Sequence, residues 1–284
     1  MVVCRDFETR HGRTLSYEVY KPRDDGTGMP VMFIHGWRSS PAMFHDLVSC
    51  LDHGDIRCIL PHLTRDASLT RDHAARASPR AALDLIDELR IDHLGLVAFG
   101  MFGGSIVRYL VRELGYRRFT FVSLLAPGPC SIDTPAREAF WNMLPAETRA
   151  KILDLPADVL DSMVQKAVDL FNMQGTAAVR EGLYADLHSL VEEISTLASA
   201  AKKKHEACHI PVEVICGEID EVVPLELSFK TVRYFGEVHI SVIPLAGHNF
   251  VTDFYEETAR CMQEFLAERV NIASPLTSPR RARP

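Results

Sequence analysis

Residues 94–110, LGLVAFGMFGGSIVRYL, decide the fold of this chain of 284 residues. They begin with an apolar run over 94–99, which is typical of a buried β-strand. Glycines follow at positions 100, 103 and 104. The residues after them predict an amphipathic helix over 103–114. A buried strand that leads through a turn into a helix indicates the repeating unit of an α/β protein.

The same alternation extends in both directions from this stretch. Apolar or alternating runs predict further strands over 7–9, 14–20, 31–34, 57–60, 119–125, 212–216 and 238–243. Helices are predicted over 41–51 and 253–269, and another helix is predicted to start at Pro79 after a Ser78 N-cap. We therefore expect a mostly parallel central sheet with helices on both faces.

Composition and charge exclude several classes of protein. Hydrophobic residues make up 47% of the chain and charged residues 24%, as in ordinary folded proteins. The net charge of −7 disfavours a nucleic-acid-binding protein, because such proteins present basic surfaces. The longest apolar run, 94–107, is too short to cross a membrane, and the charged N-terminus lacks the apolar core of a signal peptide. We therefore expect a cytoplasmic protein.

The segment from 128 to 205 differs in character from the rest of the chain. It is rich in Met, Leu, Ala and Asp, and it predicts helices but no strand. It divides the predicted α/β core into 1–127 and 206–271. The segment is either an ordinary helical insertion or a cap that lines a hydrophobic pocket, with Trp141 as a pocket residue. The last residues, 272–284, are rich in Pro, Ser and Arg and predict a disordered tail.

Three short motifs stand in order along the chain: HGW at 35–37, GEIDEVVP at 217–224 and AGH at 246–248. Each motif alone carries little information. In this order, and with the helical insertion between the first two, they resemble the α/β-hydrolase superfamily. The resemblance covers nearly the whole chain. It implies the α/β-hydrolase fold, in which a mostly parallel sheet is flanked by helices and carries a helical cap.

The resemblance fails at the catalytic nucleophile. The superfamily carries this residue in a G-x-S-x-G motif, on the sharp turn between a strand and a helix. Counting back from Gly103 and Gly104, we place Met101 at the nucleophile position, and Phe99 replaces the first glycine. A thioether has no proton to lose, whereas covalent acyl or alkyl transfer needs Ser, Cys or Asp. We therefore expect no covalent catalysis of the usual kind.

Other parts of the superfamily's machinery remain. By resemblance, Asp220 and His248 form a dyad in which the carboxylate orients and charges the imidazole. Either residue could instead hold its loop in place, but their joint presence at the family positions favours the dyad. An oxyanion hole needs only backbone N–H groups, and the resemblance assigns these to Trp37 and Phe102.

A histidine base beside two backbone donors can remove a proton from an acidic C–H or O–H group and hold the resulting anion. Elimination, isomerisation, cyclisation, C–C cleavage and cofactor-free oxygenation all proceed in this way without an acyl-enzyme. The cofactor-free ring-cleaving dioxygenases of this fold are similar in their histidine base and their Gly-Trp loop. They differ in placing the acid on the sixth strand, where this chain has Phe121.

The remaining candidates are pocket residues. Phe99 and its neighbours make an apolar elbow, which favours a small hydrophobic carbonyl or aromatic ligand. His35, beside Gly36, is expected to support the turn behind the oxyanion loop. His62 follows a predicted strand and is either a polar pocket residue or an ordinary loop histidine.

The sequence carries no nucleotide, flavin or metal motif, so we expect neither a cofactor nor a metal. The seven cysteines are odd in number and include no C-x-x-C pair, which disfavours a disulfide framework. Two alternatives to a general-base enzyme stay open. One is a non-catalytic ligand-binding relative, and the other is a hydrolase in which His248 activates water. A homodimer also stays open, and neither nucleic acid nor membrane is an expected partner.

Overall fold

The computed structural model describes residues 2–20, 28–36, 39–51, 56–63, 71–127, 210–223, 225, 228–229 and 237–270. The chain divides into two compact units. The first comprises Met1–Ser68, Ala77–Cys130 and Lys203–Pro284, and the second comprises Leu69–Arg76 and Ser131–Lys202. Of the second unit, only residues 71–76 are described. The predicted cap, 128–205, and the predicted tail, 272–284, lie outside the described residues and stay predictions.

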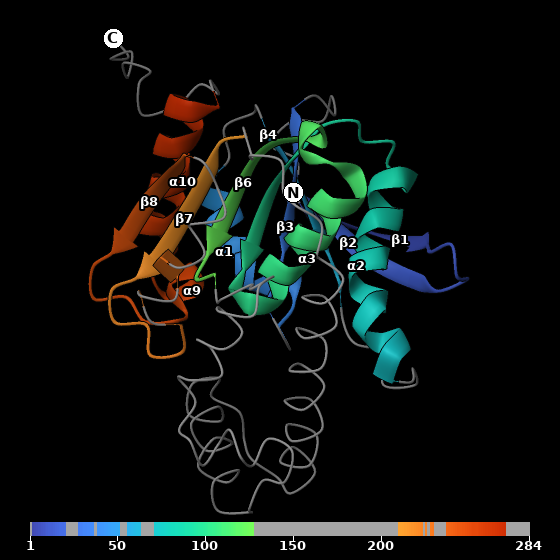
Figure 1. Ribbon diagram of the computed structural model, residues 1–284, viewed down its shortest axis with the longest axis horizontal. Helices are drawn as coiled ribbons and strands as arrows, with labels where there is room; N and C mark the ends of the chain where they lie inside the picture. The colour runs from blue at the N-terminus through green and yellow to red at the C-terminus, as the bar shows by residue number, and fades with distance from the viewer. Residues whose placement is uncertain are drawn as a thin grey trace, which may run out of the picture. The chain divides into compact units, whose positions relative to one another are not determined.

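The described strands form one sheet in the order β1-β2-β4-β3-β5-β6-β7-β8 (Figure 1). Their bounds are β1 Val2–Glu8, β2 Thr14–Tyr20, β3 Met29–Ile34, β4 Ile56–Pro61, β5 Leu94–Phe99, β6 Phe119–Leu125, β7 Val212–Gly217 and β8 Val238–Ile243. β2 pairs antiparallel with β1 and with β4, and every other pair is parallel. The expected α/β sheet is therefore present.

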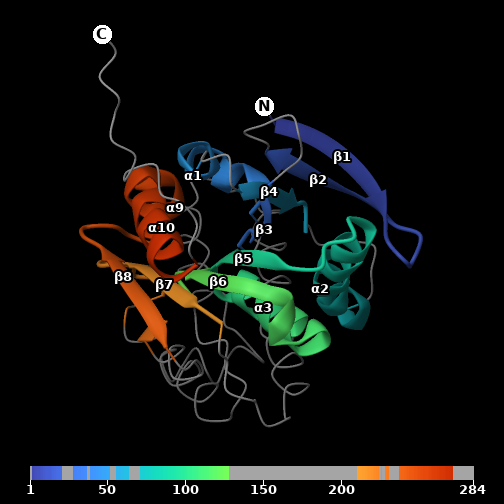
Figure 2. The ribbon, with the colours of Figure 1, turned by 90° about the horizontal axis from the view of Figure 1, so that it is seen from above.

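Helices cover both faces of the sheet (Figure 2). On one face lie α2 (Arg71–Glu88) and α3 (Gly100–Leu114). On the other lie α1 (His45–Cys50), α9 (Phe250–Asp253) and α10 (Tyr255–Arg269). The 3₁₀ turns η1 (Pro41–Phe44) and η2 (Tyr116–Arg118) lead into α1 and β6. Among the described residues, no helix combines the length and the apolar character needed to cross a membrane.

Some predicted helix boundaries are wrong. The helix predicted over 41–51 is split into η1 and α1. The helix predicted over 253–269 is interrupted at Phe254, whose φ of −130° and ψ of 42° leave the helical region. Pro79 lies inside α2, not at its start. Proline has no backbone N–H, so α2 lacks one of its helical hydrogen bonds at this position.

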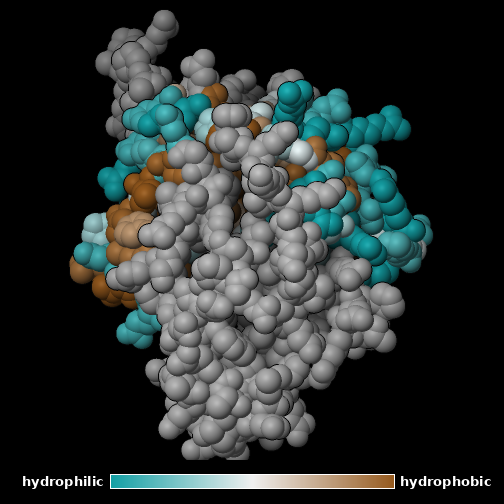
Figure 3. Space-filling model, viewed as in Figure 1, coloured by the Kyte–Doolittle hydropathy of each residue, from teal (hydrophilic) through white to brown (hydrophobic). Residues whose placement is uncertain are grey.

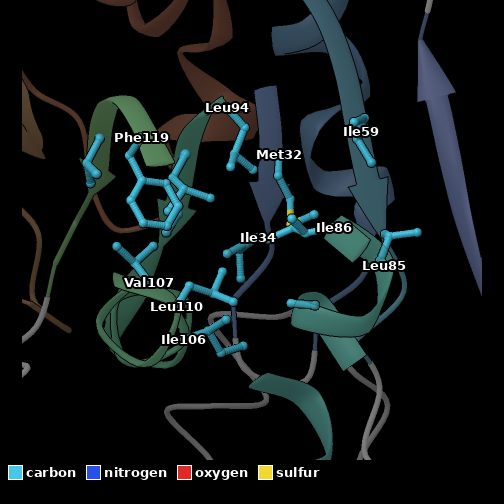
Figure 4. Packing of buried hydrophobic residues seen from close by; sticks show 14 of the residues in the cluster. Met32, Ile34, Ile59, Leu85, Ile86, Leu94, Ile106, Val107, Leu110 and Phe119 are labelled. Atoms are coloured by element: carbon cyan, nitrogen blue, oxygen red, sulfur yellow. The ribbon is translucent and has the colours of Figure 1, made fainter. Parts of the chain in front are cut away.

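Two hydrophobic cores hold the helices to the sheet. One lies under α2 and α3, where ten of its residues are labelled in Figure 4: Met32, Ile34, Ile59, Leu85, Ile86, Leu94, Ile106, Val107, Leu110 and Phe119. The other lies under α1, α9 and α10. Along β5, alternate side chains enter opposite cores, and all six residues are buried. Burial on both faces explains why this strand reads as a continuous apolar run.

Candidate active site

The candidate residues follow the carboxyl ends of parallel strands. His35 and Gly36 follow β3, the glycine-rich turn follows β5, Asp220 follows β7 and His248 follows β8. Parallel strands bring their carboxyl ends to one edge of a sheet, which is where open α/β sheets bind their ligands. The topology therefore collects residues that lie far apart in the sequence.

The loop after β7 contacts the loop after β8 through hydrogen bonds of the backbone and of one side chain. The N–H of Ile219 donates to the carbonyl of Ala246 at 3.0 Å, and the N–H of Leu245 donates to the Glu218 carboxylate at 2.9 Å. A Cβ placed on Gly217 would lie only 2.4 Å from the Ala246 carbonyl oxygen. Glycine at this position therefore permits the approach of the two loops.

This approach brings Asp220 and His248 together. His248 Nδ1 lies 2.9 Å from Asp220 Oδ2, and the two side chains are 9% and 1% exposed. The other carboxylate oxygen, Oδ1, accepts the N–H groups of Val222 at 2.9 Å and Val223 at 2.7 Å. The carboxylate is thus fixed on both sides. Donation from Nδ1–H to Asp220 leaves Nε2 as the ring nitrogen that can accept a proton.

Phe99, the last residue of β5, forms an apolar wall beside the histidine. Its ring centroid lies 4.9 Å from that of His248 and 6.2 Å from that of Phe250. A Cβ placed on Gly36 would lie 2.7 Å from Phe99 Cδ1, so the Phe99 ring also contacts the loop after β3. Phe99 therefore links the histidine loop to the loop that carries the HGW motif.

His35 is buried and has a partner for each ring nitrogen. Nδ1 lies 2.8 Å from the carbonyl of Gly36, and Nε2 accepts the N–H of Leu63 at 3.0 Å. Burial lowers the pKa of His35. A neutral imidazole with its proton on Nδ1 satisfies both contacts. Its ring also stacks on Phe102 of α3, with centroids 6.3 Å apart, so His35 joins two strand-end segments.

His62 belongs to a cluster that the sequence did not indicate. Its Nε2 lies 3.0 Å from Glu18 Oε1, and the Nε2 of His45 lies 2.6 Å from Glu18 Oε2. The three residues come from β2, α1 and the end of β4, and only the strand pairing brings them together. Among the described residues, no group of His, Cys, Asp or Glu side chains is arranged to hold a metal ion.

The turn between β5 and α3 is sharp. β5 ends at Phe99, and α3 begins at Gly100, not at 103 as predicted. Gly100 has a φ of +67°. Met101 lies in the first turn of α3, but its side chain is outside the described part of the structure, as are Trp37 and Trp141. Their assignments to the nucleophile position, the oxyanion hole and the pocket stay predictions.

No protein-family model matches the chain. It is 24% identical over 248 residues to the (R)-3-hydroxydecanoyl-ACP:CoA transacylase of Pseudomonas putida, covering 82% of this chain and 81% of the relative. It is 24% identical over 267 residues to the 2-hydroxymuconate semialdehyde hydrolase of Pseudomonas sp. strain CF600, covering 86% of this chain and 89% of the relative. It is also 22% identical over 248 residues to the AB hydrolase superfamily protein YisY of Bacillus subtilis (82% and 89%).

Solved structures share the fold. The haloalkane dehalogenase DbeA of Bradyrhizobium elkani superposes with a TM-score of 0.67 at 14% identity, covering 94% of this chain and 98% of that one. An esterase from Thermogutta terrifontis gives a TM-score of 0.59 at 18% identity, covering 95% and 100%. The chain has the α/β-hydrolase fold.

Proposed function

We propose that this chain is an enzyme in which His248, oriented by Asp220, acts as a general base in a reaction without a covalent acyl intermediate. The proposed substrate is a small hydrophobic carbonyl or aromatic compound. The observation that carries the proposal is the 2.9 Å contact between His248 Nδ1 and Asp220 Oδ2. A base needs a fixed tautomer and a partner for the imidazolium that forms, and a buried carboxylate with two further hydrogen bonds supplies both.

The proton is taken by His248 Nε2 and is later returned by the imidazolium. The enolate or phenolate left behind needs hydrogen-bond donors, and the proposed donors are the backbone N–H groups of Phe102 and Trp37. Phe102 lies in the first turn of α3, which has no side-chain N-cap and no acidic residue in that turn. The positive dipole end of a helix start favours an anion.

The reaction classes compatible with this chemistry are elimination, isomerisation, cyclisation, C–C cleavage and cofactor-free oxygenation. One relative is named for 2-hydroxymuconate semialdehyde, which is a small enolisable carbonyl compound. That name supports the substrate class. The wall formed by Phe99 beside the imidazole favours an apolar portion in the ligand.

The test is proton exchange, because it measures general-base action before the product is known. Small benzyl ketones such as phenylacetone, together with 2-hydroxymuconate semialdehyde, are incubated with the protein in D₂O, and loss of the α-proton signal is followed by NMR. We expect catalysed exchange that falls roughly 10²–10⁴-fold in His248→Ala. Asp220→Asn should slow exchange less, because the imidazole remains but loses the carboxylate that fixes its tautomer and stabilises its charge.

The same experiment separates the alternatives. Ligands that bind, by saturation-transfer NMR, without any exchange would indicate a non-catalytic binding protein. Hydrolysis of phenyl acetate that depends on His248 would indicate a hydrolase with activated water. Labelling by a serine-directed fluorophosphonate, with loss of activity, would contradict the absence of a nucleophile. Each variant is first checked for an unchanged melting curve.

A further inference from the structure

We propose that Gly100, one residue before Met101, occupies the position from which a nucleophile would project in this fold. It follows that the substrate's own acidic O–H or C–H group takes the place of the nucleophile's side chain in front of His248. The second statement rests on the proposed function. The first concerns geometry alone, and it can be tested without a known substrate.

The backbone of the turn carries the argument. A nucleophile in this fold sits on a sharp strand-to-helix turn, so the residue at which the backbone turns marks the position. Among residues 99–104, whose backbone the structure describes, only Gly100 has a φ in the left-handed region, at +67°. Phe99 is extended, with a φ of −103° and ψ of 133°, and still pairs with Leu125 of β6. The sharp turn therefore occurs at Gly100.

The spacing of small residues does not decide the register. With Met101 as the central residue of a G-x-S-x-G pattern, the outer positions hold Phe99 and Gly103. With Gly100 as the central residue, they hold Ala98 and Phe102. Each register thus keeps one small residue and replaces the other with phenylalanine. The spacing to Gly103 and Gly104 favours the register with Met101 at the centre. The φ of Gly100 favours the register with Gly100 at the centre.

The surroundings of Gly100 fit a position that faces the site. A Cβ placed on Gly100 meets no described atom within 4 Å, whereas one on Gly103 would lie 3.0 Å from the carbonyl oxygen of Ile34 in the sheet. Among the described residues, therefore, nothing fills the direction of the Gly100 Cβ, whereas the direction of the Gly103 Cβ is filled. Phe99, directly before Gly100, has its ring centroid 4.9 Å from the imidazole of His248. The residue directly before the turn therefore lies beside the proposed base.

A glycine at this position has a chemical consequence. It supplies no side-chain atom, so the group that His248 deprotonates must come from the ligand or from solvent. The proton moves from the ligand's O–H or C–H to Nε2, and the anion remains on the ligand beside the N–H groups at the start of α3. The ligand class is a compound with an acidic proton next to an apolar portion that contacts Phe99.

The test compares two introduced thiols, Gly100→Cys and Met101→Cys. A thiol in front of His248 forms a thiolate–imidazolium pair, which lowers its pKa and makes it reactive below neutral pH. We expect the thiol in Gly100→Cys to react with iodoacetamide at pH 6 at least roughly tenfold faster than the thiol in Met101→Cys. This advantage should disappear in the Gly100→Cys/His248→Ala double variant. Peptide mass spectrometry separates these thiols from the native cysteines.

A side chain at a positive φ is strained, so Gly100→Cys could fail to fold. In that case Met101→Cys still decides the question. A His248-dependent reactive thiol in Met101→Cys would overturn the inference, and an ordinary thiol there would support it. The two proposals can also fail separately. If proton exchange occurs and the thiol at position 101 is the one that His248 activates, this inference is refuted and the proposed function stands. Activation at position 100 without exchange would refute the proposed function and leave the geometry standing.

Discussion

Glu213 is a carboxylic residue buried in the core of the protein, where such side chains are rare. It lies on β7, is fully buried, and accepts a hydrogen bond of 2.7 Å from the hydroxyl of Ser123 on β6. Its other carboxyl oxygen, Oε1, has no partner among the described residues. Burial raises the pKa of Glu213 to about 8. The side chain is therefore protonated at neutral pH and forms part of the core under α10 without carrying charge.

This setting predicts a pH dependence of stability. Between pH 4.5 and 8, the folded chain keeps a proton on Glu213 that the unfolded chain releases, so the free energy of unfolding should fall as pH rises. The loss amounts to at most about 4 kcal/mol. Glu213→Gln keeps an acceptor for Ser123 and should remove this slope, so that the variant exceeds the wild type in stability at pH 8.

Urea denaturation at pH 5, 6.5 and 8 measures the slope. Glu237→Gln is the matched control, because the Glu237 side chain is 95% exposed, and this change should leave the slope as it is. A Glu213→Gln variant whose stability falls with pH as steeply as that of the wild type would rule out Glu213 as the source.

Among the elements, the pairing of the loops after β7 and β8 controls the site. These loops touch at Gly217, where a side chain would meet the carbonyl oxygens of Ala246 at 2.4 Å and Gly247 at 2.6 Å. No change of side-chain rotamer can relieve the clash of an added methyl group here, because both atoms that it meets belong to the backbone. The histidine loop must move as a whole, and His248 moves with it.

Gly217→Ala should therefore lower stability by about 1–3 kcal/mol, as overpacking does, and lengthen the Asp220–His248 contact. The downfield proton resonance of His248 Nδ1–H, measured by NMR in both proteins, reports that contact. Gly247→Ala is the control, since its Cβ would meet no described atom within 4 Å. Equal effects of the two substitutions would show that general loop flexibility, and not the close approach, matters.

For the whole molecule, the sheet separates two cores that do not share side chains. Ile106 of α3 lies in one and Ile215 of β7 lies in the other, and both are fully buried. Ile106→Val and Ile215→Val should each cost about 0.5–1.5 kcal/mol. The double variant should cost their sum within about 0.5 kcal/mol. A larger deviation in urea denaturation would mean that the sheet transmits packing strain from one face to the other.

One edge of the described sheet exposes apolar side chains. β8 is an edge strand of the described sheet, and its Ile240 and Val242 are 42% and 39% exposed. Figure 3 shows apolar side chains on the side of the view where β7 and β8 lie. The homodimer considered from the sequence stays a prediction, and sedimentation velocity measures it directly.

The parts of the fold that the sequence predicts well are those buried on both faces. β5 reads as an uninterrupted apolar run, and β3, β6 and β7 are mostly apolar, because nearly all of their residues are buried. For β1 the sequence predicts only the end of the strand, since most of β1 is exposed and the segment carries charged residues. The interruption at Phe254 is equally invisible in a helical pattern that continues on both sides of it.

Within the site, contacts between recognised motifs could be anticipated and contacts between elements could not. Asp220 and His248 stand in motifs with a known order, and the structure places them in contact; their catalytic roles stay predictions. The link from Glu18 to His45 and His62 depends on the antiparallel pairing of β2 with β4. Nor does spacing reveal a backbone dihedral, so the sequence could not show that the sharp turn lies at Gly100.

The pairing of β6 with β7 also has a consequence for synthesis on the ribosome. Ser123 and Glu213 face each other across this pair although they are 90 positions apart in the chain. At roughly 5–20 residues per second, the edge of β6 waits roughly 5–20 s for its partner. During that interval the nascent chain presents an apolar strand edge that can pair with other chains. Asp220 and His248 both emerge later still, so a translation product that stops before β7 carries the aggregation risk of this fold and none of its proposed chemistry.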